Sequence, residues 1–277
     1  MKSKMRLQLL GAFRLTCDTT PINLANAPRL QSLLTYLALQ PPLAHQRQQL
    51  AFLLWPDSSD KQAQTNLRKQ IYRLRHEFPE IEAVLAIDPY TILRRPEISW
   101  SVDAVDLETA ITCAAASQDR HQARALLEQA IRLYQGELLP GGYDEWLGPP
   151  RERLQRLYGS TLEQLTHILA DQGDDARAID YAHRLLQHDP LHEESYRQLM
   201  QLYARTDHRS AALRTFHTCA EIFGQELGVE PSAITCDLYE QIRRGESPCL
   251  RPAPFRKRLH LGQAVETPRF DLTLTKA

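Results

Sequence analysis

The sequence predicts a mainly helical protein with a small β component, because short alternating segments open the chain and helical periodicity fills most of the rest. Residues 5–15 alternate apolar and polar positions around Gly11, and Ile22–Leu24 follows a Thr-Thr-Pro turn, so both segments are expected to form short strands. From Val105 onwards, apolar residues recur at helical spacing. With 277 residues and 43% hydrophobic content, the chain is long enough for one or two domains with a tail.

Three helices and a set of short strands are expected after the first sheet. Asn26 is a candidate cap, with Pro28 in the first turn, for a helix that Pro41 ends. A second helix is expected over residues 46–55 and a third over residues 60–78. Short strands then follow at Val84–Ile87, Tyr90–Leu93 and Ile98–Trp100. Strands, three helices and a hairpin, in this order, predict a winged helix-turn-helix with an additional N-terminal sheet.

The third of these helices has one apolar face and one basic face. At about 100° per residue, the apolar positions share one sector: Ala63, Leu67, Ile71, Leu74 and Phe78. The other side is polar, with Thr65, Arg68, Lys69, Tyr72 and His76 across it and Arg73 and Arg75 on its flanks. Ser58, Ser59 and Gln62 offer capping groups at the start. Such a helix either displays a solvated charged surface or lies on a protein core and reaches into DNA.

DNA binding requires two kinds of contact, to base edges and to the sugar-phosphate backbone. Arginine forms paired hydrogen bonds with guanine in the major groove, whereas hydroxyl, amide and flanking cationic groups hold phosphates. The candidates for base-edge contacts are Arg68, Lys69, Tyr72 and Arg73. The candidates for backbone contacts are Thr65, Asn66, Arg75 and, in the expected wing, Arg94.

The helical half contains an internal repeat. Ala178 and Ala212 lie 34 residues apart in similar Ala-rich segments, which is the tetratricopeptide period. Asp189-Pro190 precedes a helix expected at 191–205, where a helical hairpin would restart. Small residues let paired helices approach closely, and an ordinary helical bundle is the alternative. We therefore expect a winged-helix DNA-binding domain at 5–104, an all-α tetratricopeptide-like repeat domain at 105–245, and a linker or mobile tail at 246–277.

Charge is distributed unevenly along the chain. Residues 1–105 carry 13 Lys and Arg against 9 Asp and Glu, residues 106–245 carry 14 against 22, and residues 246–277 carry 6 against 3. A basic end joined to an acidic middle suits a protein that meets a polyanion at one end and other proteins elsewhere. No run of about 18 apolar residues and no signal-peptide pattern occurs, so a cytoplasmic protein without membrane contact is expected. The 5 scattered cysteines indicate reduced thiols.

Motifs of enzymes are not found. His183, His188 and His192 lack the spacing of metal ligands, and no metal site is expected. Asp144-Glu145-Trp146 follows a Gly-rich turn and is explained better by helix capping and a buried Trp than by catalysis. The sequence contains no GxSxG, no phosphate-binding loop and no dinucleotide-binding glycines, so no cofactor is expected. The alternatives to a DNA-binding protein are a protein-binding helical-repeat scaffold and a ligand-sensing adaptor with only weak DNA binding.

Two sets of motifs resemble parts of one family of bacterial regulators. The first set is Leu9–Leu15, Leu34–Leu39, Leu53–Asp57 and Asn66–Arg75. It resembles the OmpR-type winged helix of transcriptional activators of the streptomycete antibiotic regulatory protein type. The second set is Gly136–Trp146, Arg151–Leu154, Asp189–Glu194, Leu199–Ala204 and Glu226–Ser232. It resembles the bacterial transcriptional activator domain of the same proteins.

This resemblance covers residues 5 to about 244 and implies a sequence-specific DNA-binding activator. It further implies binding to double-stranded DNA at promoter direct repeats as a homodimer, and contact with RNA polymerase. The chain departs from the family at the expected wing, where Asp88-Pro89-Tyr90 replaces the usual Gly followed by an aromatic residue. It also has no GxxxxGK[ST] motif, so ATP-driven control within this polypeptide is not expected.

Overall fold

The computed structural model describes residues 4–246, so the tail expected at 246–277 lies outside it from residue 247 onwards. The strands are β1 Lys4–Gln8, β2 Arg14–Cys17, β3 Thr20–Ile22, β4 His45–Gln46, β5 Leu85–Ile87, β6 Thr91–Arg94 and β7 Ser99–Val102. The helices of the first half are α1 Pro28–Leu39, α2 Arg47–Leu54, α3 Asp60–Glu77 and α4 Ile81–Val84. Those of the second half are α5 Asp103–Ala116, α6 Arg120–Leu133, the 3-10 helix η1 Glu145–Leu147, α7 Gly148–Asp171, α8 Asp175–His188, α9 Glu193–Arg205, α10 Arg209–Glu226 and α11 Ala233–Arg244. The prediction of a mainly helical protein with a small β component is confirmed.

A four-stranded sheet begins the fold, in the order β3-β2-β1-β7. β1 pairs antiparallel with β2 and parallel with β7, so the last strand of the first half returns beside the first one. Met5 and Leu7 of β1 are buried, whereas Lys4 and Arg6 are exposed on the other side of the strand. Gly11, at a φ of +80°, breaks the alternating segment into two strands.

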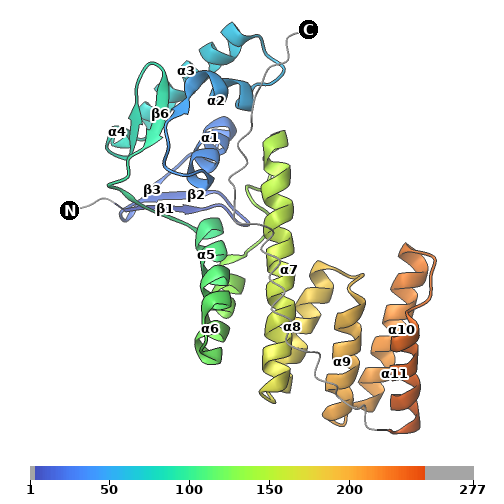
Figure 1. The fold of residues 1–277 in the computed structure, drawn as a ribbon. Coiled ribbons are helices and arrows are strands. Elements are labelled where there is room, and N and C mark those ends of the chain that lie inside the picture. The colour runs from blue at the N-terminus through green and yellow to red at the C-terminus, as the bar shows by residue number, and fades with distance from the viewer. Residues whose placement is uncertain (1–3, 247–277) are drawn as a thin grey trace.

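Helices α1, α2 and α3 pack together beside a second sheet, in which β6 lies between β4 and β5. The apolar stripe predicted for α3 is buried: Ala63, Leu67, Ile71 and Leu74, with Phe78 at the helix end. Its polar face therefore points away from the core. β5 and β6 form an antiparallel hairpin that α3 precedes in the chain (Figure 1).

The second half is an array of helices that leads away from the N-terminal half, with α7 standing between the α5–α6 pair and α8 (Figure 1). α8, α9, α10 and α11 follow in order along the array. Ala178 of α8 and Ala212 of α10 are fully buried, as expected for small residues where helices approach closely. The helix predicted at 191–205 is present and begins at Glu193. Among the helices between residues 4 and 246, none is long and apolar enough to cross a membrane.

The two halves meet in one continuous core rather than through a linker. The buried Asp103 carboxylate, at the start of α5, accepts hydrogen bonds of 2.9 Å from the backbone N–H groups of Leu9 and Leu10, and one of 2.8 Å from that of Ala104. Further along, the Gly11 N–H donates to the Glu137 carbonyl (2.9 Å). The loop before α7 thus lies against the end of β1, and the first core continues into it through Leu138, Leu139, Leu147 and Leu154.

Several expected details differ in the structure. Helix α1 is capped at Ala27 rather than Asn26, and the Ser59 side chain makes no capping bond at α3. The short helix α4 was not expected, and β7 joins the first sheet instead of the hairpin. Asp144 is the N-cap residue of η1, as expected, but its carboxylate makes no capping bond and accepts hydrogen bonds from Arg29 and Ser32 of α1 instead. The positions of β7 and of the Asp144 carboxylate are set by contacts with residues distant in the sequence.

Candidate nucleic-acid interface

The outward face of α3 carries the predicted base-edge residues. Arg68 and Lys69 are exposed, and Tyr72 is 76% exposed although its aromatic ring is large. Arg73 is half-buried, and its Nε lies 3.7 Å from a Glu77 oxygen one helical turn away. The helix thus presents three cationic side chains and one aromatic ring on a surface that the core does not cover.

The residues of α3 that are predicted to contact the DNA backbone each interact with another residue of the protein. The Thr65 hydroxyl donates to the Lys61 carbonyl (2.7 Å), and the Asn66 side-chain oxygen accepts from Gln62 (2.9 Å). Both side chains lie near the beginning of the exposed face. Arg75 is exposed and is held by Glu82, with 2.7 Å between a guanidinium nitrogen and a carboxylate oxygen.

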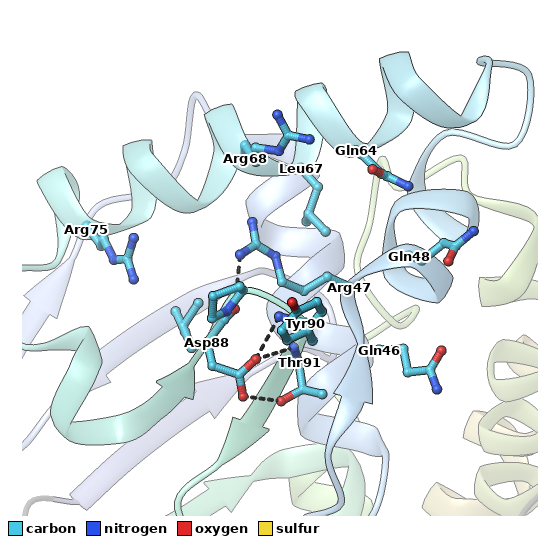
Figure 2. Close-up of a pocket in the computed structure, with 12 residues that line it drawn as sticks. Gln46, Arg47, Gln48, Gln64, Leu67, Arg68, Arg75, Asp88, Tyr90 and Thr91 are labelled. Atoms are coloured by element: carbon cyan, nitrogen blue, oxygen red, sulfur yellow. Dashed lines mark hydrogen bonds between the residues drawn. The ribbon is translucent and has the colours of Figure 1, made fainter.

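A hollow of about 790 Å³ lies between the start of α2, α3 and the β5–β6 turn (Figure 2). It brings together three arginines from two helices: Arg47 of α2, and Arg68 and Arg75 of α3. Burial lowers the pKa of Arg47, and the positive charges of Arg68 and Arg75 lower it further. Because like charges repel, a cluster of this kind is stabilised by any anion that enters the hollow.

Arg47 was not among the predicted site residues. Its backbone N–H donates to the Tyr90 carbonyl (2.7 Å) and its guanidinium to the Asp88 carbonyl (3.0 Å), so it ties the start of α2 to the hairpin turn. A cation in the first turn of a helix is unfavourable with respect to the helix dipole. Arg47 is in the first turn of the helix predicted at 46–55, and this unfavourable position is the sequence signal that could have identified it as a site residue.

The β5–β6 turn is ordered without glycine. The Asp88 carboxylate accepts hydrogen bonds from the backbone N–H groups of Tyr90 and Thr91, each 2.7 Å, and from the Thr91 hydroxyl at 2.6 Å. These bonds, with that from the Thr91 hydroxyl foremost, lower the pKa of Asp88. No residue of the turn has a positive φ, so glycine is not required there. Tyr90, 81% exposed, stands at the tip.

Arg94 lies on the inner side of the hairpin strand. Its guanidinium donates to the Gln40 carbonyl (2.7 Å) and stacks over the Trp100 ring at 5.2 Å. Burial lowers its pKa. Seven of the eight predicted site residues therefore lie together on α3. Arg47 joins them at the hollow, and the eighth residue, Arg94, points towards the protein.

This arrangement suits an extended anion. Cations spaced along α3, Arg47 at the adjoining hollow and the exposed Tyr90 can contact such an anion at several points. Within residues 4–246, no three His, Cys, Asp or Glu side chains are arranged to hold a metal ion.

Sequence similarity to known proteins extends over both the N-terminal half and the helical half of the chain. The Regulatory protein AfsR of Streptomyces griseus is 25% identical over 249 residues, which are 90% of this chain and 26% of AfsR. The Transcriptional regulatory protein MoaR1 of Mycobacterium tuberculosis is 24% identical over 259 residues, covering 87% of this chain and 79% of MoaR1. The chain thus spans about a quarter of the length of AfsR.

A solved structure supports the fold. Mycobacterium tuberculosis EmbR, in complex with a low affinity phosphopeptide, superposes with a TM-score of 0.68 at 21% identity, over 88% of this chain and 66% of the EmbR chain. The family model of the bacterial transcriptional activator domain matches residues 102–243, which begin at the end of β7 and extend into α11. Since this match covers more than half of the sequence, the chain belongs to the family of proteins with a bacterial transcriptional activator domain.

Proposed function

We propose that this protein is a sequence-specific DNA-binding transcriptional regulator, with an OmpR-type winged helix at residues 5–104 and tetratricopeptide-like repeats at 105–245. The observation that carries the proposal is the exposed basic face of α3 beside an arginine-lined hollow and a hairpin. In this role α3 enters the major groove and the β5–β6 hairpin is the wing. The names of the relatives AfsR and MoaR1, both regulatory proteins, support the same role.

The roles of the site residues follow from their surroundings. Arg68, Lys69, Tyr72 and Arg73 contact base edges, because they occupy the open face of α3. Arg47, Arg75, Thr65 and Asn66 contact phosphates, because they border that face or line the hollow. Arg94 instead positions the wing, since its guanidinium joins β6 to the Gln40 carbonyl and to Trp100.

The helical half is proposed to mediate homodimerisation on tandem promoter repeats and contact with RNA polymerase. Its excess of Asp and Glu makes it a poor ligand for DNA and favours protein partners. Activation, rather than repression, follows from the family to which the domain belongs.

Selection of bound fragments from random and genomic DNA with the full chain tests the proposal. We expect enrichment of a motif in two direct copies. Recovery of unselected sequences at low salt only, with no motif, would refute specific DNA binding and favour a protein-binding scaffold.

An Arg73→Ala variant tests base recognition. It should weaken specific binding by about 1–3 kcal/mol and relax the preference at one position of the motif. Arg14→Ala is the matched control, because Arg14 is an exposed arginine on β2, outside the proposed interface. Equal losses of affinity for specific and random DNA would show that Arg73 contacts phosphates and not base edges.

An Arg47→Ala variant tests the hollow. Affinity should fall on all sequences, and the slope of log K against log salt should decrease by about one unit, as for loss of one phosphate contact. Arg75→Ala should behave in the same way. An unchanged slope in both variants would show that the hollow does not receive a phosphate.

A further inference from the structure

The far end of the helical array exposes apolar side chains where α10 turns into α11. Leu227, Val229 and Ile234 are 53%, 51% and 68% exposed, and they fall within eight consecutive residues. We call these three residues the terminal patch. The α10–α11 loop carries Leu227 and Val229, Ile234 is in the first turn of α11, and this loop lies at the outer edge of the array, away from α3 (Figure 1).

The end of this loop, where α11 begins, makes buried and polar contacts with α9. The Glu193 carboxylate at the start of α9 accepts hydrogen bonds from the Ser232 N–H (2.8 Å), the Ser232 hydroxyl (2.6 Å) and the Thr235 hydroxyl (2.5 Å). Arg197 completes the network, 3.5 Å from Glu193 and 3.1 Å from the Thr235 hydroxyl. Pro231 and Thr235 are buried. The terminal patch therefore spans a loop and the first turn of α11, and hydrogen bonds to Glu193 anchor the start of that helix.

The chain segment that carries the patch has only acidic charged residues, and the nearby Arg197 is paired with Glu193 and Glu194. Between residues 221 and 242 the sequence contains no Lys, Arg or His, and its charged residues are Glu221, Glu226, Glu230, Asp237 and Glu240. Within residues 4–246, Glu226, Glu230 and Asp237 form no ion pair. Burial raises the pKa of Cys236, and the charges of Glu230 and Asp237 raise it further, which places both carboxylates beside the start of α11.

We propose that the terminal patch, with its acidic rim, is a docking surface for a basic protein segment that carries apolar anchor residues. Exposed apolar side chains rimmed by polar groups mark protein interaction sites, and the carboxylates select a cationic partner. DNA is disfavoured as an occupant because it is a polyanion. A second copy in a two-fold arrangement is disfavoured because it would bring two acidic rims together.

The direct test uses the full chain with labelled isoleucine δ1 methyl groups and a synthetic amphipathic helix of leucine and lysine as the probe. The Ile234 methyl resonance should shift saturably with the lysine peptide and stay unmoved with the same peptide carrying glutamate for lysine. Leu227→Ser combined with Ile234→Ser should weaken binding about tenfold or more, because two anchor contacts are lost. Leu43→Ser is the control, since Leu43 is 64% exposed in the N-terminal half.

Charge reversal separates a docking surface from general attraction to an acidic protein. Glu230→Lys combined with Asp237→Lys should weaken binding of the lysine peptide and create binding of the glutamate peptide. Glu152→Lys combined with Asp180→Lys changes the net charge equally at exposed positions on α7 and α8, and should leave both affinities unchanged.

Three results would overturn the proposal: an unmoved Ile234 methyl, equal effects of the two charge reversals, or equal effects of the serine variants and Leu43→Ser. Sedimentation velocity of the full chain adds a fourth. If self-association occurs and is abolished by the Leu227 and Ile234 substitutions, the patch is an interface between copies and not a site for a basic segment. None of these results bears on DNA binding by α3.

Discussion

Replacing Asp103 with alanine should strongly destabilise the protein, because this carboxylate joins its two halves. It is 8% exposed and is the acceptor for three backbone N–H groups, those of Leu9, Leu10 and Ala104. In the Asp103→Ala variant these three donors lose their acceptor at a site that water reaches poorly. The end of β1 and the start of α5 are then no longer joined by hydrogen bonds.

The expected loss can be worked out from these contacts. Each buried donor left without an acceptor costs about 1–3 kcal/mol. The net loss is smaller than the sum of these costs, because the wild-type carboxylate itself is desolvated. Burial raises the pKa of Asp103, and the alanine variant no longer carries this buried charge. We expect a loss of about 3–5 kcal/mol, a large share of the roughly 5–15 kcal/mol by which domains are stable.

Urea unfolding of the full chain, followed by circular dichroism and by the fluorescence of its 3 tryptophans, measures this loss. Asp106→Ala is the matched control, since Asp106 is on the same helix and accepts one hydrogen bond, from the Ser101 hydroxyl (2.8 Å). It should cost about 1 kcal/mol or less. If Asp103→Ala cost no more than the control, the carboxylate would not be the connection described above.

Further perturbations test other contacts. Gly11→Ala should lower the melting temperature, because its φ of +80° costs an alanine about 1–2 kcal/mol and the new methyl group would lie 2.6 Å from the Gln135 carbonyl oxygen; unchanged melting would contradict this. Burial lowers the pKa of His45, so the free energy of unfolding of the wild type should fall as the pH drops below the ordinary histidine pKa. In urea titrations at pH 7.5 and 5.5, His45→Gln should remove this part of the pH dependence. Asp88→Ala should speed hydrogen exchange at the amides of the β5–β6 turn, that of Thr91 included, and equal exchange in both proteins would show that the turn is held by other contacts.

The features that the sequence predicted well are those encoded by local periodicity. Helix α3 and its buried stripe follow from residues three and four apart, and the helix at 193–205 follows from the Asp189-Pro190 break before it. The exposed basic face was predictable for the same reason, since burying one stripe directs the opposite side chains to solvent.

Features that depend on distant contacts were not accessible in this way. β7 pairs with β1 across more than ninety residues, and no local pattern specifies that partner. Arg47 joins the site only because the β5–β6 turn approaches the start of α2. Arg94 was equally ambiguous, because its neighbour Arg95 is also cationic and the strand register decides which of the two meets Trp100.

The continuous core between the two halves has a consequence for the proposed binding to paired DNA sites. Because Asp103 and the loop before α7 fix α3 to the helical array, two copies that touch through their arrays would hold their α3 helices at a set angle. DNA turns once in about 10–10.5 base pairs. Inserting about half a turn between the proposed direct repeats should therefore abolish cooperative binding, and inserting a whole turn should restore part of it, whereas a flexible connection between the halves would tolerate both insertions.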